Sequence, residues 1–230
     1  MKGAFLAVLG ISLATLVAVP AHAGTVDIGG GWSASWPASL DGLVAITDHN
    51  VNSVVVVPNT GGQTGVIFQK TAEFTQGPVL GVFPTIPITF TQTAVNAAEW
   101  LIIDDEIITN STGVDWTDFH MLLVDGGNAV FDPARTTGGD GPIGWTIDPF
   151  QQAQFTTPEL LDIWDGVVPN GTQWNPGDGA TDGLLFIDVT LGGEGNFTTF
   201  TLKETPTPEP ASLALMLIGG AMVLRRRHTS

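Results

Sequence analysis

The sequence predicts an all-β protein, a single antiparallel β-sandwich, and three observations support this fold class. Short runs of β-branched and aromatic residues recur along the chain, separated by clusters of Gly, Pro, Asn and Asp. A helical period is rare among the 230 residues, which include 29 Gly and 15 Pro. The central part of the chain is long enough for one domain with a sizeable core. We therefore expect one sandwich over residues 24–203, with a short apolar segment near each end of the chain.

Residues 1–23 have the pattern of a signal peptide that directs export through the Sec route. Lys2 supplies the positive charge, residues 4–19 form the apolar stretch, and Ala21-His22-Ala23 has small residues at both positions that signal peptidase requires. Cleavage after Ala23 leaves Gly24 as the first residue of the mature protein. The alternative is a retained N-terminal anchor, which is disfavoured because Pro20 and small residues directly follow the apolar stretch.

In the sandwich we expect four short strands, then a long hairpin, and a pair of strands at the end. The hairpin comprises residues 100–109 and 116–124, and Asn110-Ser111-Thr112-Gly113 forms its turn. The last pair, residues 184–191 and 197–203, is joined by a Gly-rich connection. The four short strands are residues 51–57, 65–69, 79–83 and 87–91.

Residues 132–183 are rich in Gly, Pro and Asp, and we interpret most of them as long loops. One short helix is predicted there, because Thr157 suits the N-cap, Pro158 the first helical position and Gly166 the end. The apolar residues between these signals continue to Trp164.

The charge distribution excludes some classes of partner. All 23 acidic residues lie between Asp27 and Glu209, and of the seven Lys and Arg residues only Lys70, Arg135 and Lys203 lie in that stretch. The strongly negative charge of this part of the chain repels other polyanions, so we expect no nucleic-acid partner. Neutral sugars and divalent cations are more plausible ligands. The absence of Cys excludes disulfides, thiolate metal sites and a cysteine nucleophile.

The sequence predicts no enzymatic activity. His49 and His120 are the two histidines between the terminal segments, and no Gly-x-Ser-x-Gly motif accompanies them. We interpret His120 as a structural residue of its strand. Two carboxylates can hydrolyse a glycosidic bond, but among this many acids a suitable pair arises by chance. A polysaccharide-active hydrolase is therefore the least favoured hypothesis.

Clustered acids make calcium the candidate cation. Three acids interrupt an otherwise apolar strand, and in the expected hairpin two more come near them across the turn. Calcium takes roughly six to eight oxygen ligands, which carboxylates and turn carbonyls provide. The alternative is a set of solvated acids, and a weaker second candidate is the acidic loop at residues 178–183. The first cluster consists of Asp104, Asp105, Glu106, Asp115 and Asp118.

Three of the seven Trp residues fall in the Gly-rich region and are candidates for carbohydrate contact. An exposed indole ring can stack on a sugar ring, whereas packing in the core is the commoner use of Trp. Both alternatives are open for Trp145, Trp164 and Trp174.

The last part of the chain has three segments in a fixed order. Residues 204–210 form a Pro-rich linker that ends in Pro208-Glu209-Pro210, and proline favours extended rather than helical backbone. Residues 211–224 are uncharged, as expected of a transmembrane helix, although shorter than the roughly 20 residues that usually span a bilayer. Residues 225–230 begin with Arg225-Arg226-Arg227, which the positive-inside rule keeps in the cytoplasm.

This order of Pro-Glu-Pro, apolar helix and arginine cluster resembles the PEP-CTERM sorting signal. The resemblance implies processing by an exosortase, a transpeptidase-like membrane enzyme of Gram-negative bacteria that make exopolysaccharide. It also implies an inner-membrane-anchored precursor that later reaches the cell surface or the extracellular matrix. A plain C-terminal tail anchor is the alternative. Residues 100–123 are similar to the ectodomains of many proteins with this signal, which implies a β-sandwich of no assigned activity.

Two hypotheses from different classes follow. The first is a non-enzymatic protein of the cell surface or of a biofilm exopolysaccharide matrix, with a structural or adhesive role. The second is a lectin-like carbohydrate-binding module that depends on calcium and uses the loop tryptophans. In both, exopolysaccharide is the candidate partner, signal peptidase and exosortase are the processing enzymes, and the C-terminal helix contacts the membrane.

Overall fold

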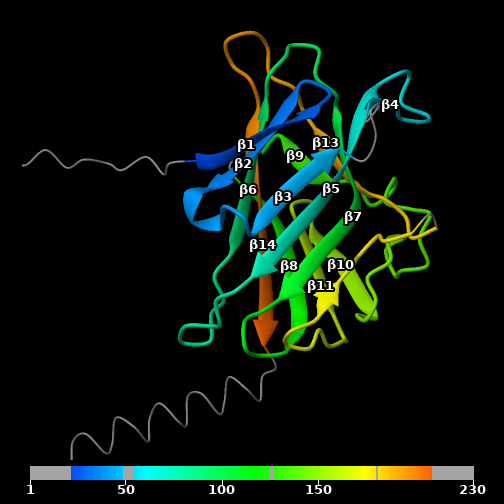
Figure 1. Ribbon diagram of the computed structural model, residues 1–230. Coiled ribbons are helices and arrows are strands. Elements are labelled where there is room, and N and C mark those ends of the chain that lie inside the picture. Colours follow the sequence, from blue (N-terminus) through cyan, green and yellow to red (C-terminus); the bar gives the residue numbers. More distant parts are fainter. Residues whose placement is uncertain (1–21, 49–53, 125–126, 180, 209–230) are drawn as a thin grey trace, which may run out of the picture.

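The computed structural model describes residues 22–48, 54–124, 127–179 and 181–208. These residues form an all-β protein with two sheets packed face to face, which confirms the predicted all-β, sandwich-like class (Figure 1). Their only helical element is one short 3₁₀ turn, η1 (Ala38–Leu40). Most of the predicted signal peptide and all of residues 209–230 lie outside the described residues.

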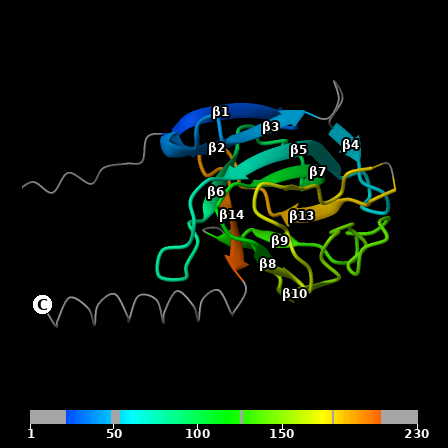
Figure 2. The same ribbon diagram turned by 60° about the horizontal axis from the view of Figure 1, so that its bottom comes forward.

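The first sheet contains seven strands, and every neighbouring pair in it is antiparallel. Its order is β1-β2-β6-β14-β8-β11-β10, so the last strand of the chain lies at its centre. Figure 2 shows the two edge strands, β1 and β10, on opposite sides of the body. The strands are β1 (His22–Gly29), β2 (Trp32–Pro37), β6 (Ile86–Gln92), β14 (Thr199–Pro208), β8 (Trp116–Val124), β11 (Leu160–Trp164) and β10 (Gln152–Thr157).

The second sheet follows the order β3-β5-β7-β13-β9, with β4 paired to β5 and β12 paired to β7. The pairing of β5 with β7 is parallel, so the prediction of a purely antiparallel sandwich is wrong at this pair. The chain between them passes through β6 in the other sheet, which provides the long crossover that a parallel pair needs. Figure 1 shows β3, β5 and β7 crossing obliquely in front of β14 and β8. The strands are β3 (Val44–Asp48), β4 (Val54–Val56), β5 (Thr64–Phe74), β7 (Trp100–Asn110), β9 (Ala129–Phe131), β12 (Gln173–Trp174) and β13 (Leu185–Val189).

The core lies between the sheets and follows from the alternation of side chains along each strand. In β5 the even-numbered residues from Val66 to Phe74 are buried, and residues of β6 and β14 face them from the other sheet. Phe90 of β6 packs against Phe68 and Phe200, with ring centroids 5.5 and 5.3 Å apart. A smaller cluster covers the outer face of the second sheet and consists of Val57, Trp100, Ile102 and Phe186.

The hairpin predicted at residues 100–124 is wrong, because β7 and β8 belong to different sheets. Both edges of β7 are already occupied, by β5 on one side and by β13 and β12 on the other. The predicted turn is instead a corner between the sheets, which the buried Asn110 stabilises. Its Nδ2 donates to the carbonyl oxygens of Val114 and Val168, both at 2.9 Å.

The strand pair predicted at residues 184–203 is also wrong, since β13 and β14 lie in opposite sheets. The buried side chain of Gln92 stabilises the crossing between them. Its Oε1 accepts bonds from the backbone nitrogens of Gly192 and Thr198 at 2.8 and 3.0 Å. Its Nε2 donates to the carbonyl oxygens of Ala94 and Gly192. Gln92 is about 100 residues away from Gly192 and Thr198 in the sequence, so the local strand pattern could not predict this contact.

The helix predicted at residues 157–166 is wrong, and this segment belongs to a β-hairpin of β10 and β11. Thr157 Oγ1 accepts a bond from the backbone nitrogen of Glu159 at 3.3 Å, which closes the hairpin turn instead of capping a helix. The following residues alternate in burial, and Leu161 and Ile163 are fully buried. The segment interpreted as long loops therefore contains three strands, β10, β11 and β12.

Three of the four predicted short strands are confirmed as β4, β5 and β6, with different bounds. Residues 79–83 form a turn instead, with a bridge between Val79 and Val82 and with Leu80 at a φ of 53°. The side chains of Val79, Leu80 and Val82 are 74, 93 and 69% exposed. Because β6 begins just after this apolar turn and runs antiparallel to β14, the turn lies at the end of the molecule where β14 ends.

β14 continues to Pro208, past the predicted end of the sandwich at Lys203. Its pairing with β6 ends at Glu204, whereas its pairing with β8 continues to Pro208. Proline lacks a backbone donor and is tolerated where one side of a strand is unpaired, as it is here. Most of the predicted linker is therefore a strand, in which Pro206 and Pro208 are buried.

A chain that ends after Lys203 is expected to be less stable than one that ends after Pro208. The shorter chain loses part of the pairing with β8 and loses Glu204, a buried partner of Lys70. Removal of one partner of a buried ion pair costs about 3–5 kcal/mol. Thermal unfolding followed by circular dichroism, on two chains that both start at Gly24, measures the difference. Equal melting temperatures would show that residues 204–208 are a passive linker.

Candidate functional site

β7 contains a β-bulge at residues 104–105 that changes which face of the strand points into the core. The register with β5 moves from Phe68–Ile103 to Lys70–Glu106, so β7 has one residue more than β5 between these two pairs. Before the bulge the odd-numbered residues of β7 belong to the main core, and after it the even-numbered ones are buried. Without the extra residue, Glu106 would face outward.

The bulge brings Glu106 to Lys70, and β14 adds Glu204 from the opposite sheet. Lys70 Nζ lies 3.2 Å from Glu106 Oε1 and 2.6 Å from Glu204 Oε1. All three side chains are 0% exposed. These residues, which we name the buried triad, join two neighbouring strands of one sheet to the central strand of the other.

The surroundings of the buried triad are apolar. The residues paired with Glu204 in the adjacent strands are Ile86 and Met121, and Phe68 precedes Lys70 on the same face; all three are buried. The contact distances within the triad are those of close ion pairs. Among the described residues, Lys70 Nζ and the four carboxylate oxygens of the triad have no hydrogen-bond partner outside the triad.

Burial and mutual charge decide the protonation of the triad. Burial raises the pKa of Glu106, the attraction of Lys70 lowers it, and the repulsion of Glu204 raises it again, to a value of about 8. Burial lowers the pKa of Lys70, but the two carboxylates outweigh this effect and the pKa is raised. Near neutral pH, Glu106 therefore holds its proton and Lys70 its charge.

Replacing Lys70 with Met is expected to lower the free energy of unfolding by about 3–5 kcal/mol, because two buried carboxyl groups lose their cation. A compensated variant, Lys70→Met with Glu106→Leu and Glu204→Leu, should be more stable than Lys70→Met alone, since it buries no charge. Urea unfolding followed by Trp fluorescence gives both values. If Lys70→Met unfolds at the same urea concentration as the parent, the triad does not support the fold.

The structure does not gather the acids predicted to bind calcium. Glu106 faces the core, whereas Asp105 lies on the other face of β7 and accepts a bond from Gln69 Nε2. Asp115 and Asp118 follow the corner and accept bonds from other segments of the first sheet and its loops. Within the described ranges, no group of three or more His, Asp or Glu side chains is arranged to hold a metal ion. The hairpin that brings the two sets together is absent, and calcium binding itself stays a prediction.

Two of the three tryptophans predicted to contact sugar are core residues. Trp145 is 0% and Trp174 is 1% exposed. The Trp174 ring packs edge-on against Phe119 and Phe150, with centroid distances of 4.8 and 5.0 Å. Because a buried ring cannot stack on a sugar, the prediction is wrong for these two residues. Trp164, at the end of β11, is half-buried.

His120 contacts an acidic residue of the neighbouring strand, and its structural role stays a prediction. Its Nδ1 lies 2.7 Å from Oδ1 of Asp162, the residue directly opposite on β11. Thr156 Oγ1 of β10 donates to the other carboxylate oxygen of Asp162. The three side chains therefore connect β8, β11 and β10 at one edge of the first sheet.

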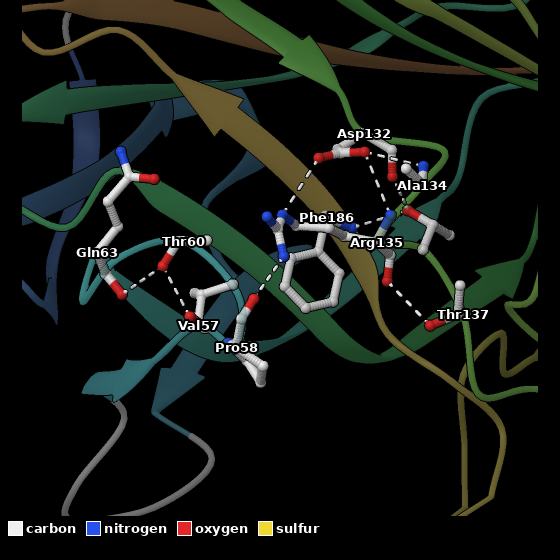
Figure 3. Close-up of polar contacts among 10 residues, drawn as sticks. Val57, Pro58, Thr60, Gln63, Asp132, Ala134, Arg135, Thr137 and Phe186 are labelled. Atoms are coloured by element: carbon white, nitrogen blue, oxygen red, sulfur yellow. Dashed lines mark hydrogen bonds and ion pairs between the residues drawn. The ribbon is translucent and has the colours of Figure 1, made fainter.

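A hollow of about 370 Å³ lies next to Arg135, and we name it the Arg135 hollow. Figure 3 shows the Arg135 guanidinium between the Asp132 carboxylate and the Pro58 carbonyl, beside the ring of Phe186. Nη1 donates to Pro58 O at 2.7 Å, and Nε lies 3.5 Å from Asp132 Oδ2. The guanidinium carbon is 4.9 Å from the centre of the Trp100 ring, a cation–π distance. Apolar lining residues of the hollow include Val57, Ala134, Leu184 and Phe186.

Asp132 positions Arg135 beside the hollow. The sequence alone did not predict either residue as part of a site. Asp132 Oδ1 accepts bonds from the backbone nitrogens of Ala134 and Arg135 at 2.8 and 3.2 Å. Burial and the repulsion of Asp132 raise the pKa of Asp188, and Arg135 partly offsets this effect. Arg135 is one of very few cations in a strongly acidic body, and this rarity is the sequence signal that could have pointed to the hollow.

The predicted sorting and cleavage residues lie at the borders of the described chain. Pro208 is the last residue of β14, and Ala23 and Gly24 belong to β1. Ala21, Glu209, Pro210, Arg225, Arg226 and Arg227 lie outside the described residues. Within the described part of the chain, no helix is long and apolar enough to cross a membrane, and residues 211–224 fall outside that part.

Comparison of the chain with known proteins found no matching family model, no matching curated protein and no matching solved structure.

Proposed function

We propose that this protein is exported and has a structural or adhesive role at the cell surface or in an exopolysaccharide matrix. The observation that carries the proposal is the position of Pro208-Glu209-Pro210 directly at the end of the central strand β14. The folded body is thereby joined, without a long spacer, to a segment with the order of a PEP-CTERM sorting signal. Signal peptidase and an exosortase are its proposed processing enzymes, and the precursor is anchored in the inner membrane.

The exposed apolar turn at residues 79–82 supports this proposal. It lies at the same end of the molecule as Pro208, and Thr85, just after the turn, has its Oγ1 3.0 Å from Thr205 Oγ1 of β14. When residues 211–224 enter the membrane, this end of the sandwich faces the bilayer. An exposed apolar group is favourable there, since contact with lipid removes it from water.

The proposed role is structural rather than catalytic. Among the described residues, the fully buried charged side chains are those of the buried triad, and none of them lines the Arg135 hollow. Catalytic groups with strongly shifted pKa values usually lie in a cleft that substrate can enter. The position of the triad inside the core therefore suits stabilisation of the sandwich.

Glu209→Ala and Pro210→Ala are expected to leave the sandwich folded and to block C-terminal processing, because both residues lie beyond the end of β14. The mass of the protein extracted from the surface of a host with an exosortase reports whether processing has occurred. Glu194→Ala, in an exposed loop, is the matched control and should be processed like the parent. Equal processing of all three variants would show that the motif is not recognised in this chain.

Carbohydrate binding is a second candidate function, and the Arg135 hollow favours it. Its apolar lining, with Phe186, suits the face of a sugar ring, and the Arg135 guanidinium supplies donors for hydroxyl groups. The hollow takes the place of the buried tryptophans in this hypothesis. Calcium remains its proposed cofactor, with the affinity of about 10⁻⁴–10⁻³ M that is typical of extracellular modules.

Arg135→Ala is expected to weaken binding of neutral oligosaccharides about tenfold or more, because a hydrogen bond from a charged donor contributes about 1.5–3 kcal/mol. A glycan array probed with the full chain, in calcium and in EDTA, measures both the affinity and its dependence on the ion. Lys203→Ala removes a positive charge elsewhere and is the matched control. Unchanged binding by Arg135→Ala would exclude the hollow as the sugar site.

A further inference from the structure

The buried triad places an amine within reach of two carboxyl groups. Lys70 Nζ is 2.6 Å from Glu204 Oε1 and 3.2 Å from Glu106 Oε1, and all three side chains are 0% exposed. Buried polar groups are normally hydrogen-bonded. Among the described residues, the five polar atoms of the triad have no hydrogen-bond partner outside it. The amine and the two carboxyl groups therefore contact only one another in these apolar surroundings.

We propose that the side chains of Lys70 and Glu106 form an intramolecular amide bond, and that Glu204 carries the proton that this reaction must move. Lys70 and Glu106 are direct partners in the parallel pairing of β5 with β7, so the bond joins neighbouring positions of adjacent strands. Glu204 approaches from the other sheet and makes the shorter contact with Nζ. The three residues therefore have distinct roles as nucleophile, acyl group and proton carrier.

The reaction balances without a cofactor or an oxidant. The Lys70 ammonium gives one proton to the Glu204 carboxylate, and the neutral amine attacks Cδ of the protonated Glu106 carboxyl group. A C–N bond forms and a C–O bond breaks. The hydroxyl group leaves as water, with a second proton that comes from the attacking nitrogen through Glu204. The products are one amide, one water molecule and a protonated Glu204, so both atoms and charge are conserved.

The core favours this step for three physical reasons. Burial raises the pKa of Glu106 to about 8, which keeps its carboxyl group neutral, and an amine attacks a neutral carboxyl group far more readily than a carboxylate. The fold holds the reactants together, so the step avoids the entropy cost of a bimolecular encounter. Amide formation also removes two opposite charges from a medium that solvates them poorly.

Peptide mapping of the full chain, purified after export and denatured, tests the proposal. Trypsin cuts after a free lysine, so a linked Lys70 is expected to resist cleavage. Because no other Lys or Arg lies between Lys70 and Arg135, mass spectrometry should find one tryptic peptide that contains Lys70 and Glu106, ends at Arg135 and is lighter than its linear form by one water molecule. Cleavage at Lys70, with both peptides at the masses given by the sequence, overturns the proposal. A link to Glu204 instead of Glu106 overturns the assigned roles.

Glu204→Gln keeps the shape of the side chain but cannot accept the proton, so the link should be lost although Lys70 and Glu106 remain. Glu194→Gln, in an exposed loop, is the matched control and should stay linked. Circular dichroism shows whether Glu204→Gln folds, and if it does not, the peptide map of the parent decides alone. A folded Glu204→Gln variant that is still linked overturns the role of Glu204 as proton carrier.

Discussion

The ionic contacts of Lys70 constrain how the two sheets of this protein fit together. A lysine at the centre of a sandwich is tolerated only with carboxylate partners, and its two partners come from different sheets. The triad therefore fixes β5 and β7 relative to each other and places β14 opposite them. Apolar contacts alone specify register less strictly. A slip of two residues preserves an alternating apolar pattern, but here it would leave a buried charge without its partner.

The irregular parts of the fold support the same arrangement. The bulge at residues 104–105 interrupts the ladder between β5 and β7, and in return it turns Glu106 toward Lys70. Asn110 stabilises by hydrogen bonds the corner that leads from β7 to the other sheet. Gln92 does the same for the loop that leads into β14. In both corners a buried side-chain amide satisfies backbone groups that leave the regular ladder. These polar residues thus let the chain change sheets without losing backbone hydrogen bonds.

Local patterns in the sequence are sufficient for most strands and insufficient for their pairing. Alternation identifies β5, β6 and β8, but the parallel pairing of β7 with β5 depends on which edges of the complete sheet are free. The Thr157-Pro158 signal predicts a helix, because the same short-range bond can cap a helix or close a hairpin turn. The triad is partly visible in the sequence, where Lys70 and Glu204 fall in the apolar phase of their strands. Glu106 is out of phase until the bulge is known, so its role could not be predicted.

The central position of β14 has a mechanical consequence. The chain leaves the sandwich along this strand, so tension on the C-terminal segment acts parallel to β14. β14 is paired with β6 from Thr199 to Glu204 and with β8 from Thr201 to Pro208, so such a load must slide it past two neighbouring strands. Shear of this kind breaks many bonds together, whereas tension on an edge strand such as β10 would separate them one after another. A protein tethered by its C-terminal end would therefore bear force through the strand most firmly embedded in its body.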